Sequence, residues 1–468
     1  MKQRVAGNHL LSAWETLGRD LGQLPVNLFE RRRKPPAWGG RPRILVCYTQ
    51  TRLPQRATAH SRINAMTSET QAVTLVGMDA HSDKIALCVT RWRHGTDPEV
   101  QKDIATTLDA LEATYRKNVP PGALTVLEAS TNAFSIADRL EAAGFKAKVL
   151  TSDAAAGMAR PDRVNDRIDA RNLAAAYARG GTREVFRPSK PFSEWRDVFF
   201  GYRAAVKDSV RWSNRIWGFC SGHGLALPKA GFRRKADAVR AELAGHGWTA
   251  DETFHVEMLL KEYAHACEVR DIYRKRIERT VAENADMTRV MQVLGVRFVV
   301  AFALVAFIED ARRFPCAKKL VSYIGLNPTV RVSGEADGPR RVSRYGRRDL
   351  KALMVEAAKC ALRHGNSDMH KWARRKVAGK KHANVVACAL ARKLVCHVWH
   401  ILMGHPAPSK EPEASFRRKL VLAARALGPD GLAKAGHAKA ADYVDAVCRR
   451  LYPQTPPAEL RTVSLASA

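Results

Sequence analysis

The chain has 468 residues, of which 46% are hydrophobic, so it is long enough for two or three folded domains and too apolar for wholesale disorder. It carries 78 lysines and arginines against 46 aspartates and glutamates, which gives a formal net charge of +32. Because such an excess of positive charge repels itself unless a polyanion compensates it, a nucleic acid is the expected partner.

Proteins held together by disulfides or zinc, and membrane proteins, are disfavoured. Nine cysteines are scattered singly without a C-x-x-C pair, which argues against a disulfide scaffold or a zinc ribbon and for a reducing, cytoplasmic location. The closely spaced Cys396, His397 and His400 are better explained by an apolar helix than by a metal site. No basic amphipathic anchor is evident, and the most apolar run, Phe298–Ile308, is shorter than the ~20 residues that a bilayer requires.

Residues 1–70 differ from the rest of the chain. A basic run, Arg31–Lys34, precedes two prolines, and hydrophobic periodicity is poor on both sides. We interpret this region as a basic, disordered extension, or as sequence upstream of a later start at Met66. The alternative is a nucleic-acid-binding arm.

Residues 71–190 alternate between strand and helix patterns, which predicts an α/β domain with a mixed sheet. Its first two strands should form a hairpin. The expected strands are Val73–Asp79, Lys84–Val89, Ala123–Leu127 and Lys146–Leu150, and the expected helices are 100–115, 132–143 and a later one that contains Asp166 and ends at Gly180.

Four carboxylates in this domain fall at informative places. Asp79 and Glu128 end strands, and Asp166 and Asp169 stand one turn apart on one face of a helix. Taken singly, each is more often a cap or a surface acid. Together they suit phosphodiester chemistry, in which clustered carboxylates hold Mg²⁺ against the scissile phosphate. We therefore predict a magnesium site formed by Asp79, Glu128, Asp166 and Asp169.

The remainder of the chain reads as mainly helical. Residues 191–289 interleave aromatic and basic residues at helical spacing, which predicts a helical hairpin or coiled coil whose basic side could follow a nucleic-acid backbone. Residues 290–404 form a third unit of apolar helices around a polar loop, 331–346. Residues 405–468 form a basic tail that says little about chemistry.

The acidic motifs carry a resemblance. VGMDAHSDKIAL, LEAS and DRVNDRIDARNLA resemble, in order and spacing, the amino-terminal motifs of the DEDD insertion-sequence transposases of the one-ten family. That family includes the bridge-RNA-guided recombinases and the Pilin-inverting recombinase. The resemblance implies a RuvC-like domain with an RNase H fold, in which the four acids hold Mg²⁺. Val164 departs from the usual lysine two places before the first helical acid.

The third unit resembles the carboxy-terminal transposase domain of the same family, so the resemblance spans roughly residues 72–404. YIGLNPTVRVSG and RVSRYGRRDLKALMVEAA match the family's Y-x-G-L-x-P, S-G and I-S-K-x-G-N segments, with Arg344 in place of the usual lysine. Leu294 and Arg297 depart from the preceding P-G-I-G segment. The serine of the S-G step is the family's proposed nucleophile, which points to Ser333, with Ser343 as the competing candidate.

The resemblance implies a transposase that cuts and rejoins its own element through a phosphoserine link. DNA is then the substrate, a guide (bridge) RNA is an expected partner, and a dimer or tetramer is the expected assembly. Two alternatives stay open: a RuvC-like nuclease that uses a metal-activated water, and a catalytically inactive nucleic-acid-binding derivative. The expected phosphate contacts are the arginines around the serine: Arg340, Arg341, Arg344, Arg347 and Arg348.

Overall fold

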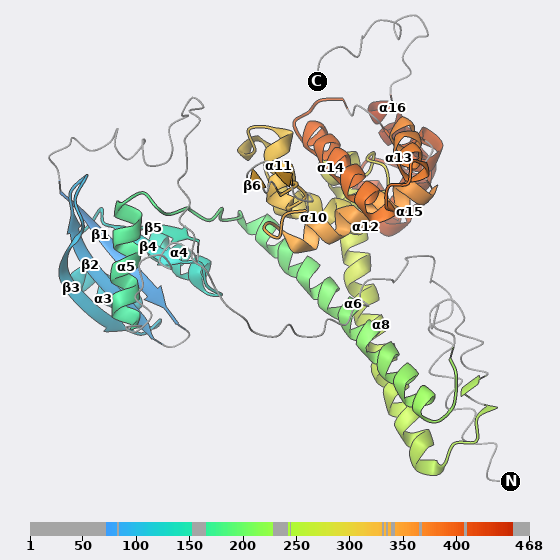
Figure 1. The fold of residues 1–468 in the computed structure, drawn as a ribbon, viewed down its shortest axis with the longest axis horizontal. Coiled ribbons are helices and arrows are strands. Elements are labelled where there is room, and N and C mark those ends of the chain that lie inside the picture. The colour runs from blue at the N-terminus through green and yellow to red at the C-terminus, as the bar shows by residue number, and fades with distance from the viewer. Residues whose placement is uncertain are drawn as a thin grey trace, which may run out of the picture. The chain divides into compact units, whose positions relative to one another are not determined.

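The computed structural model of the chain describes two compact units, which are treated separately below (Figure 1). The first comprises the described residues up to Arg187 and the second those from Pro188 onward. The expected extension, residues 1–70, lies outside the described residues. These are 72–81, 84–151, 165–227, 242–243, 245–329, 342–364, 367–406 and 410–452, together with the backbone of 332–333 and 336–337.

The first unit is built on a five-stranded mixed sheet with the order β3-β2-β1-β4-β5 (Figure 1). Strands β1, β2 and β3 are antiparallel neighbours, and β4 and β5 continue the sheet in parallel with β1. The predicted hairpin and α/β alternation are thus confirmed. The strands are β1 (Val73–Ala80), β2 (Ile85–Trp92), β3 (Glu99–Thr106), β4 (Leu124–Glu128) and β5 (Lys146–Leu150).

Helices cover both faces of this sheet. Because successive side chains of a strand point to opposite faces, β1 sends Val76 and Met78 to one face and Leu75 to the other. The first face packs against α3 (Leu111–Asn118) and α4 (Ala133–Ala142). The second packs against α5 (Asp166–Ala178), whose buried residues recur with helical spacing: Ala170, Leu173, Ala174 and Tyr177.

The helix predicted over residues 100–115 is wrong in its first half. Residues Glu99–Thr106 form β3, which pairs with β2 at the edge of the sheet, and the helix begins only at Leu111. Most of β3 is exposed, including Val100 at 45%. Because so little of this edge strand is buried, apolar and polar residues alternate only weakly along it. Its sequence pattern therefore resembles that of a helix.

The second unit opens with the predicted antiparallel helical hairpin, formed by α6 (Lys190–Gly222) and α8 (Ala250–Glu283) (Figure 1). Ile216, near the end of α6, shares a cluster with Val256, near the start of α8. Phe199, near the start of α6, shares another with Ile277. A reciprocal capping box between Thr249 and Glu252 fixes the start of α8.

A helical body follows the hairpin. Helix α10 (Phe298–Ile308) lies at the centre of this body. Nine of the 11 residues of α10 are buried, as expected of a helix that is apolar on all sides. A short β-hairpin, β6 (Val332–Ser333) and β7 (Ala336–Asp337), interrupts the helices. The helices are α9 (Ala285–Val290), α10 (Phe298–Ile308), the 3-10 turn η1 (Ala311–Arg313), α11 (Ala317–Ile324), α12 (Arg348–His364), α13 (Asp368–Ala378), α14 (Ala383–Leu402), α15 (Glu413–Lys434) and α16 (Ala440–Leu451).

The region expected to be a basic tail contributes to this body. Phe416 and Leu420 of α15 and Val444 of α16 belong to the same core as α10. Lys419 is also buried; its Nζ pairs with the carboxylate of Glu411 and donates to the carbonyl oxygen of Val296 at 2.7 Å. The two helices therefore complete the core rather than trail from it.

Among the described residues, one helix is long and apolar enough by composition to cross a membrane, contrary to the sequence expectation. It is α14, whose hydrophobic run continues on either side of Arg392 and Lys393. Its Val386, Leu390 and Leu394 are at most 2% exposed and pack into the core of the second unit. The composition of α14 is thus that of a core helix.

Candidate metal centre and serine hairpin

Helix α5 rests directly on strand β1 at Gly77. A Cβ atom placed on Gly77 would lie 1.9 Å from the carbonyl oxygen of Ala170 and 3.2 Å from the Cβ of Ala174, so only glycine permits this approach. Gly77 and Asp79 point to the same face of β1 because they are two residues apart. The first turn of α5 is therefore brought to the end of β1 that carries Asp79.

Strand register places two acids at this end of the sheet. Met78 of β1 pairs in parallel with Leu127 of β4. The next residues, Asp79 and Glu128, therefore lie next to each other at the C-terminal ends of these two strands. Asp166 and Asp169 occupy the first turn of α5, where the helix dipole favours negative charge. The side chain of Asn165 caps this helix by accepting from the amide of Arg167 at 3.0 Å.

A histidine joins the acids. The Nε2 atom of His81 lies 3.5 Å from Oδ2 of Asp79 and 3.7 Å from Oδ1 of Asp166. One ligand atom from each of Asp79, His81 and Asp166 falls within 4.8 Å of the others, a spacing that suits a shared metal ion. Sequence reasoning missed His81, although its place two residues after Asp79 in VGMDAH was a signal for it.

The carboxylates influence each other's protonation. Burial raises the pKa of Asp79 above its ordinary 3.8; the charges of Asp166 and Asp169 raise it further, and His81 opposes the shift. Burial also raises the pKa of Glu128, as do the charges of Asp79 and Asp169. The shifts of Asp79 and Glu128 thus reflect both burial and the charge of neighbouring carboxylates. A divalent cation would remove the mutual repulsion, so the donor set fits a metal bound through oxygen.

The second candidate element is the β6–β7 hairpin. Ser333 of β6 pairs with Ala336 of β7, and the loop that carries the hairpin is closed at its base. There Pro328 bridges Val342, and the amide of Ser343 donates to the carbonyl oxygen of Asn327 at 2.9 Å. The side chain of Ser333 and its neighbour Gly334 lie outside the described residues, as do Arg163 and Val164 of the acidic motif.

Two glycines lock the foot of this loop. Gly325 ends α11 with φ +80°, and Gly346 precedes α12 with φ +94°. A Cβ on Gly346 would lie 2.6 Å from the amide nitrogen of Gly325, and a Cβ on Gly325 would lie 2.2 Å from the carbonyl oxygen of Tyr345. The two backbones thus touch, and the glycines of the YIGL and RYGR motifs have a structural cause.

Ser343, the competing nucleophile, has a structural role. It is 7% exposed, and its Oγ accepts from the amide of Tyr345 at 3.1 Å. Its carbonyl oxygen also accepts from Nζ of Lys351 at 2.9 Å. A buried hydroxyl that supports a turn is poorly placed to attack a phosphate, which favours Ser333 over Ser343.

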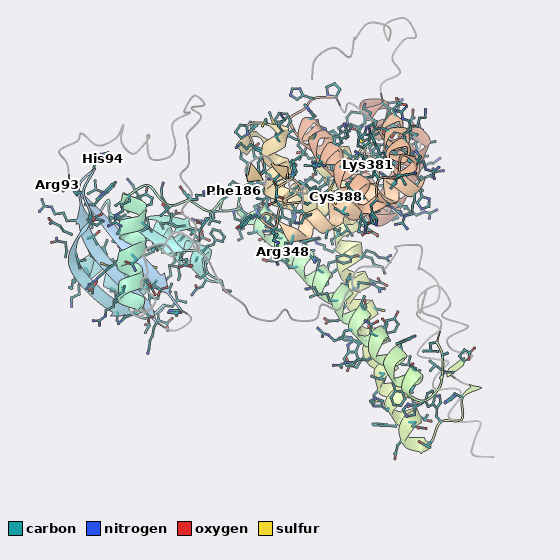
Figure 2. All side chains as sticks on the ribbon, viewed as in Figure 1. Arg93, His94, Phe186, Arg348, Lys381 and Cys388 are labelled. Carbon is teal, nitrogen blue, oxygen red and sulfur yellow. The ribbon has the colours of Figure 1, made fainter. Side chains whose placement is uncertain are left out.

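The arginines near the serine divide into three groups. Arg340 and Arg341 lie outside the described residues. Arg344 and Arg348 are exposed, the latter at the start of α12 (Figure 2). Arg347 is occupied within the protein: its Nη2 lies 2.7 Å from Oδ2 of Asp349, and its guanidinium lies 4.0 Å from the ring centroid of Phe307.

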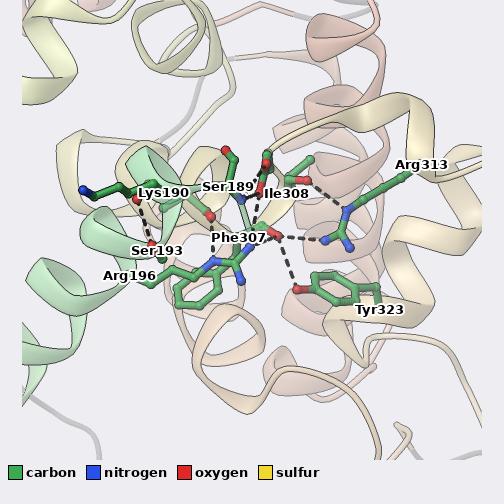
Figure 3. A network of polar contacts seen from close by, with 10 residues as sticks. Ser189, Lys190, Ser193, Arg196, Phe307, Ile308, Arg313 and Tyr323 are labelled. Carbon is green, nitrogen blue, oxygen red and sulfur yellow. Dashed lines mark hydrogen bonds and ion pairs between the residues drawn. The ribbon is translucent and has the colours of Figure 1, made fainter. Parts of the chain in front are cut away.

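Hydrogen-bond donors converge on the C-terminal end of α10, beside the loop that carries Ser333 (Figure 3). The carbonyl oxygen of Phe307 accepts from Nη2 of Arg313 at 2.8 Å, from the hydroxyl of Tyr323 at 3.3 Å and from Nη2 of Arg196 at 3.4 Å. Cations at a helix C-terminus are favoured by its dipole. Arg313 of η1 and Tyr323 of the YIGL motif, together with Arg196 of α6, therefore stabilise the end of α10 next to the loop that carries Ser333 (residues 328–342, the serine loop).

Comparisons with known proteins show what the chain is similar to. The profile of the transposase IS116/IS110/IS902 family matches residues 287–374, which include Ser333 and the two glycine turns. The transposase for insertion sequence element IS1111A of Coxiella burnetii is 25% identical over 243 residues, which cover 51% of this chain and 66% of that protein.

Two further relatives extend the match. The transposase for insertion sequence element IS1328 of Yersinia enterocolitica is 20% identical over 332 residues, covering 70% of this chain and 96% of that protein. A probable family 20 transposase of Pseudomonas aeruginosa is 23% identical over 294 residues, covering 62% and 86%. The domain match and these relatives together support an IS110-family transposase.

Proposed function

We propose that this transposase is a DNA recombinase that cuts and rejoins the DNA of its own insertion element, with a magnesium centre on a RuvC-like first unit and Ser333 as the nucleophile. The observation that supports the proposal is the approach of Asp79, His81 and Asp166 to one another, through close packing of α5 on β1, in a chain whose second unit matches the family's transposase domain.

The acidic centre supports phosphate chemistry. Asp79, Glu128, Asp166 and Asp169 would hold the magnesium ion, and His81 lies close enough to Asp79 and Asp166 to orient them or to act as a further ligand. When bound, the ion would neutralise charge that develops on the phosphate. A mixed sheet with helices on both faces and acids at the ends of β1 and β4 is compatible with the RNase H fold.

Ser333 supplies the covalent step in this proposal. Its Oγ attacks the phosphorus of a DNA phosphodiester and loses its proton to solvent, while the bond from phosphorus to the 3′ oxygen breaks and releases a 3′-hydroxyl. The phosphoserine keeps the energy of the broken bond, so a 3′-hydroxyl of another strand can displace the serine and restore the diester. A neutral serine needs activation, which is why the proposal requires both the acids and the serine.

The partners follow from the same proposal. DNA is the substrate, Arg340, Arg341, Arg344 and Arg348 contact its phosphates, and Arg347 supports the loop that carries them. A guide RNA supplies sequence specificity, and a dimer or tetramer forms in the cytoplasm. The net charge of +32 is consistent with such polyanionic partners.

Strand exchange on DNA that flanks the coding sequence tests the proposal. The wild-type chain with Mg²⁺ should yield rejoined products, whereas Ser333→Ala and Asp169→Asn should yield none and still bind DNA. Recombination that persists in either variant would contradict the proposed residue roles. Free cut ends that need Asp169 but not Ser333 would instead support the alternative, a nuclease that uses a metal-activated water.

A further inference from the structure

The most exposed large hydrophobic side chain among the described residues belongs to Tyr345, at 87%. The next most exposed, Phe254 on α8, reaches 63%. Single exposed aromatics need no special explanation in general, but Tyr345 stands in the turn that closes the serine loop.

Several backbone contacts hold the turn around Tyr345 in the conformation that exposes its ring. The amide of Tyr345 donates to Oγ of the buried Ser343, and its carbonyl group lies against Gly325. On the far side, the amide of Arg347 donates to the carbonyl oxygen of Tyr323 at 3.0 Å. With Gly346 held at φ +94°, the turn cannot rotate the ring into the core without breaking these contacts.

The charged residues around the Tyr345 ring indicate the kind of ligand that it contacts. Arg344 and Arg348 flank it and are exposed, whereas the one acid close by in sequence, Asp349, is paired with Arg347. An aromatic face bordered by exposed guanidinium groups matches a nucleobase bordered by phosphates. A ring can stack fully only on a base that has left its pair, because the faces of paired bases are covered by their neighbours in the duplex.

We propose that Tyr345 stacks on an unpaired base of the DNA strand held at the serine loop, while Arg344 and Arg348 contact the flanking phosphates. The inference rests on the proposed function, because the loop is the one that presents Ser333. It assigns Tyr345 as a positioning residue: by holding an extruded base, it fixes the register of the strand relative to the β6–β7 hairpin.

Fluorescence of 2-aminopurine tests the proposal. The probe is a short single-stranded DNA with one central 2-aminopurine, compared with the same strand in a full duplex and with single-stranded RNA of the same sequence. Wild type and Tyr345→Phe should quench the base in single-stranded DNA. Tyr345→Ala should lose the quench and weaken binding of single-stranded DNA by about 5- to 150-fold, the range reported for removal of one base–aromatic stack. Its affinity for the duplex should change less than about twofold.

Phe254→Ala is the matched control, since it removes another exposed aromatic ring of the same unit and should leave the quench intact. An unchanged quench in Tyr345→Ala would overturn the proposal. So would a Tyr345-dependent preference for RNA, or a change in sedimentation of the free protein in place of a change in DNA binding. The last result would mean that the ring contacts protein.

Formation of the Ser333 adduct is measured in the same preparations. If wild type forms the adduct and Tyr345→Ala keeps the quench, the stacking inference fails and the proposed function stands. If the quench depends on Tyr345 and no adduct forms on DNA that flanks the coding sequence, the proposed function fails and the stacking stands.

Discussion

The carbonyl oxygen of Ala170 occupies the space into which any side chain at Gly77 would extend, with only 1.9 Å between that oxygen and the position of a Cβ. This backbone contact sets how far α5 descends onto β1. The carboxylates of Asp79 and Asp166 come within reach of His81 because of it. Gly77, which has no side chain, thus allows α5 to bring Asp166 close to Asp79 and His81.

Gly77→Ala should therefore lower the stability of the first unit by about 3 kcal/mol, the upper range for overpacking a core against backbone. It should also abolish Mg²⁺-dependent stabilisation, because α5 must move away from β1. Thermal unfolding with and without Mg²⁺ measures both effects. Gly181→Ala is the control: its Cβ would meet no atom closer than 3.8 Å, so stability should change little. Retained Mg²⁺ stabilisation in Gly77→Ala would contradict the packing argument.

Asp79→Asn should stabilise the metal-free protein and remove its response to Mg²⁺. The folded state raises the pKa of Asp79 and Glu128 and so binds protons more tightly than the unfolded state. Stability without metal must then fall as the pH rises from about 4 through the raised pKa values. Urea unfolding in EDTA as a function of pH should show this fall, and Asp79→Asn should make it shallower. An unchanged pH dependence would refute the coupling between these carboxylates.

His81→Ala should shift metal preference. Imidazole nitrogen suits Mn²⁺ and later transition metals better than Mg²⁺, which prefers oxygen ligands. If His81 is a ligand, its removal should weaken Mn²⁺ binding by roughly 10-fold and Mg²⁺ binding much less. If His81 instead orients the carboxylates of Asp79 and Asp166, binding of both ions should weaken by a similar factor, at least about 10-fold. Calorimetric titration of each ion into the purified chain separates the two. No change for either ion would show that His81 only neighbours the site.

The buried pair of Lys419 and Glu411 should hold α15 in the core. The ammonium group donates to the carbonyl oxygens of Met291 at 2.8 Å and Val296 at 2.7 Å, and burial lowers its pKa. Lys419→Met leaves Glu411 buried without its partner and should cost about 3–5 kcal/mol of unfolding free energy. Adding Glu411→Gln should restore part of this loss. Arg418→Ala, an exposed neighbour, should be close to neutral.

The parts of this fold that bury a continuous apolar face could be predicted from the sequence. Phe298–Ile308 was predicted as the helix that it forms, because nine of its 11 residues are buried, and Lys146–Leu150 was predicted as the strand β5, whose last two residues are buried. Strand β3 was mistaken for helix because its residues face solvent at the sheet edge. The packing role of α15 was missed because it depends on contacts with distant residues: Lys419 donates to the carbonyl oxygens of Met291 and Val296, more than 100 positions away.

The candidate site, like the fold, could be predicted only in part from the sequence. The four acids stand out in the sequence because each ends a strand or begins a helix. The proximity of His81 to Asp166 depends on how α5 docks, which no local pattern reveals. Ser333 and Ser343 look alike in sequence, whereas burial of the latter becomes evident only once the glycine turns at Gly325 and Gly346 meet.

The central claim, covalent attack by Ser333, is tested most directly by mapping the residue that becomes joined to DNA. Trypsin cuts after Arg331, Arg340, Arg341 and Arg344, so Ser333 and Ser343 fall in separate peptides, and Ser333 is the sole hydroxyl-bearing residue of peptide 332–340. Wild-type protein is incubated with Mg²⁺ and DNA that flanks the coding sequence, digested with nuclease and trypsin, and analysed by mass spectrometry. The account predicts a nucleotide mass on peptide 332–340. A nucleotide on the Ser343 peptide, or cleaved DNA without any modified peptide, would contradict it.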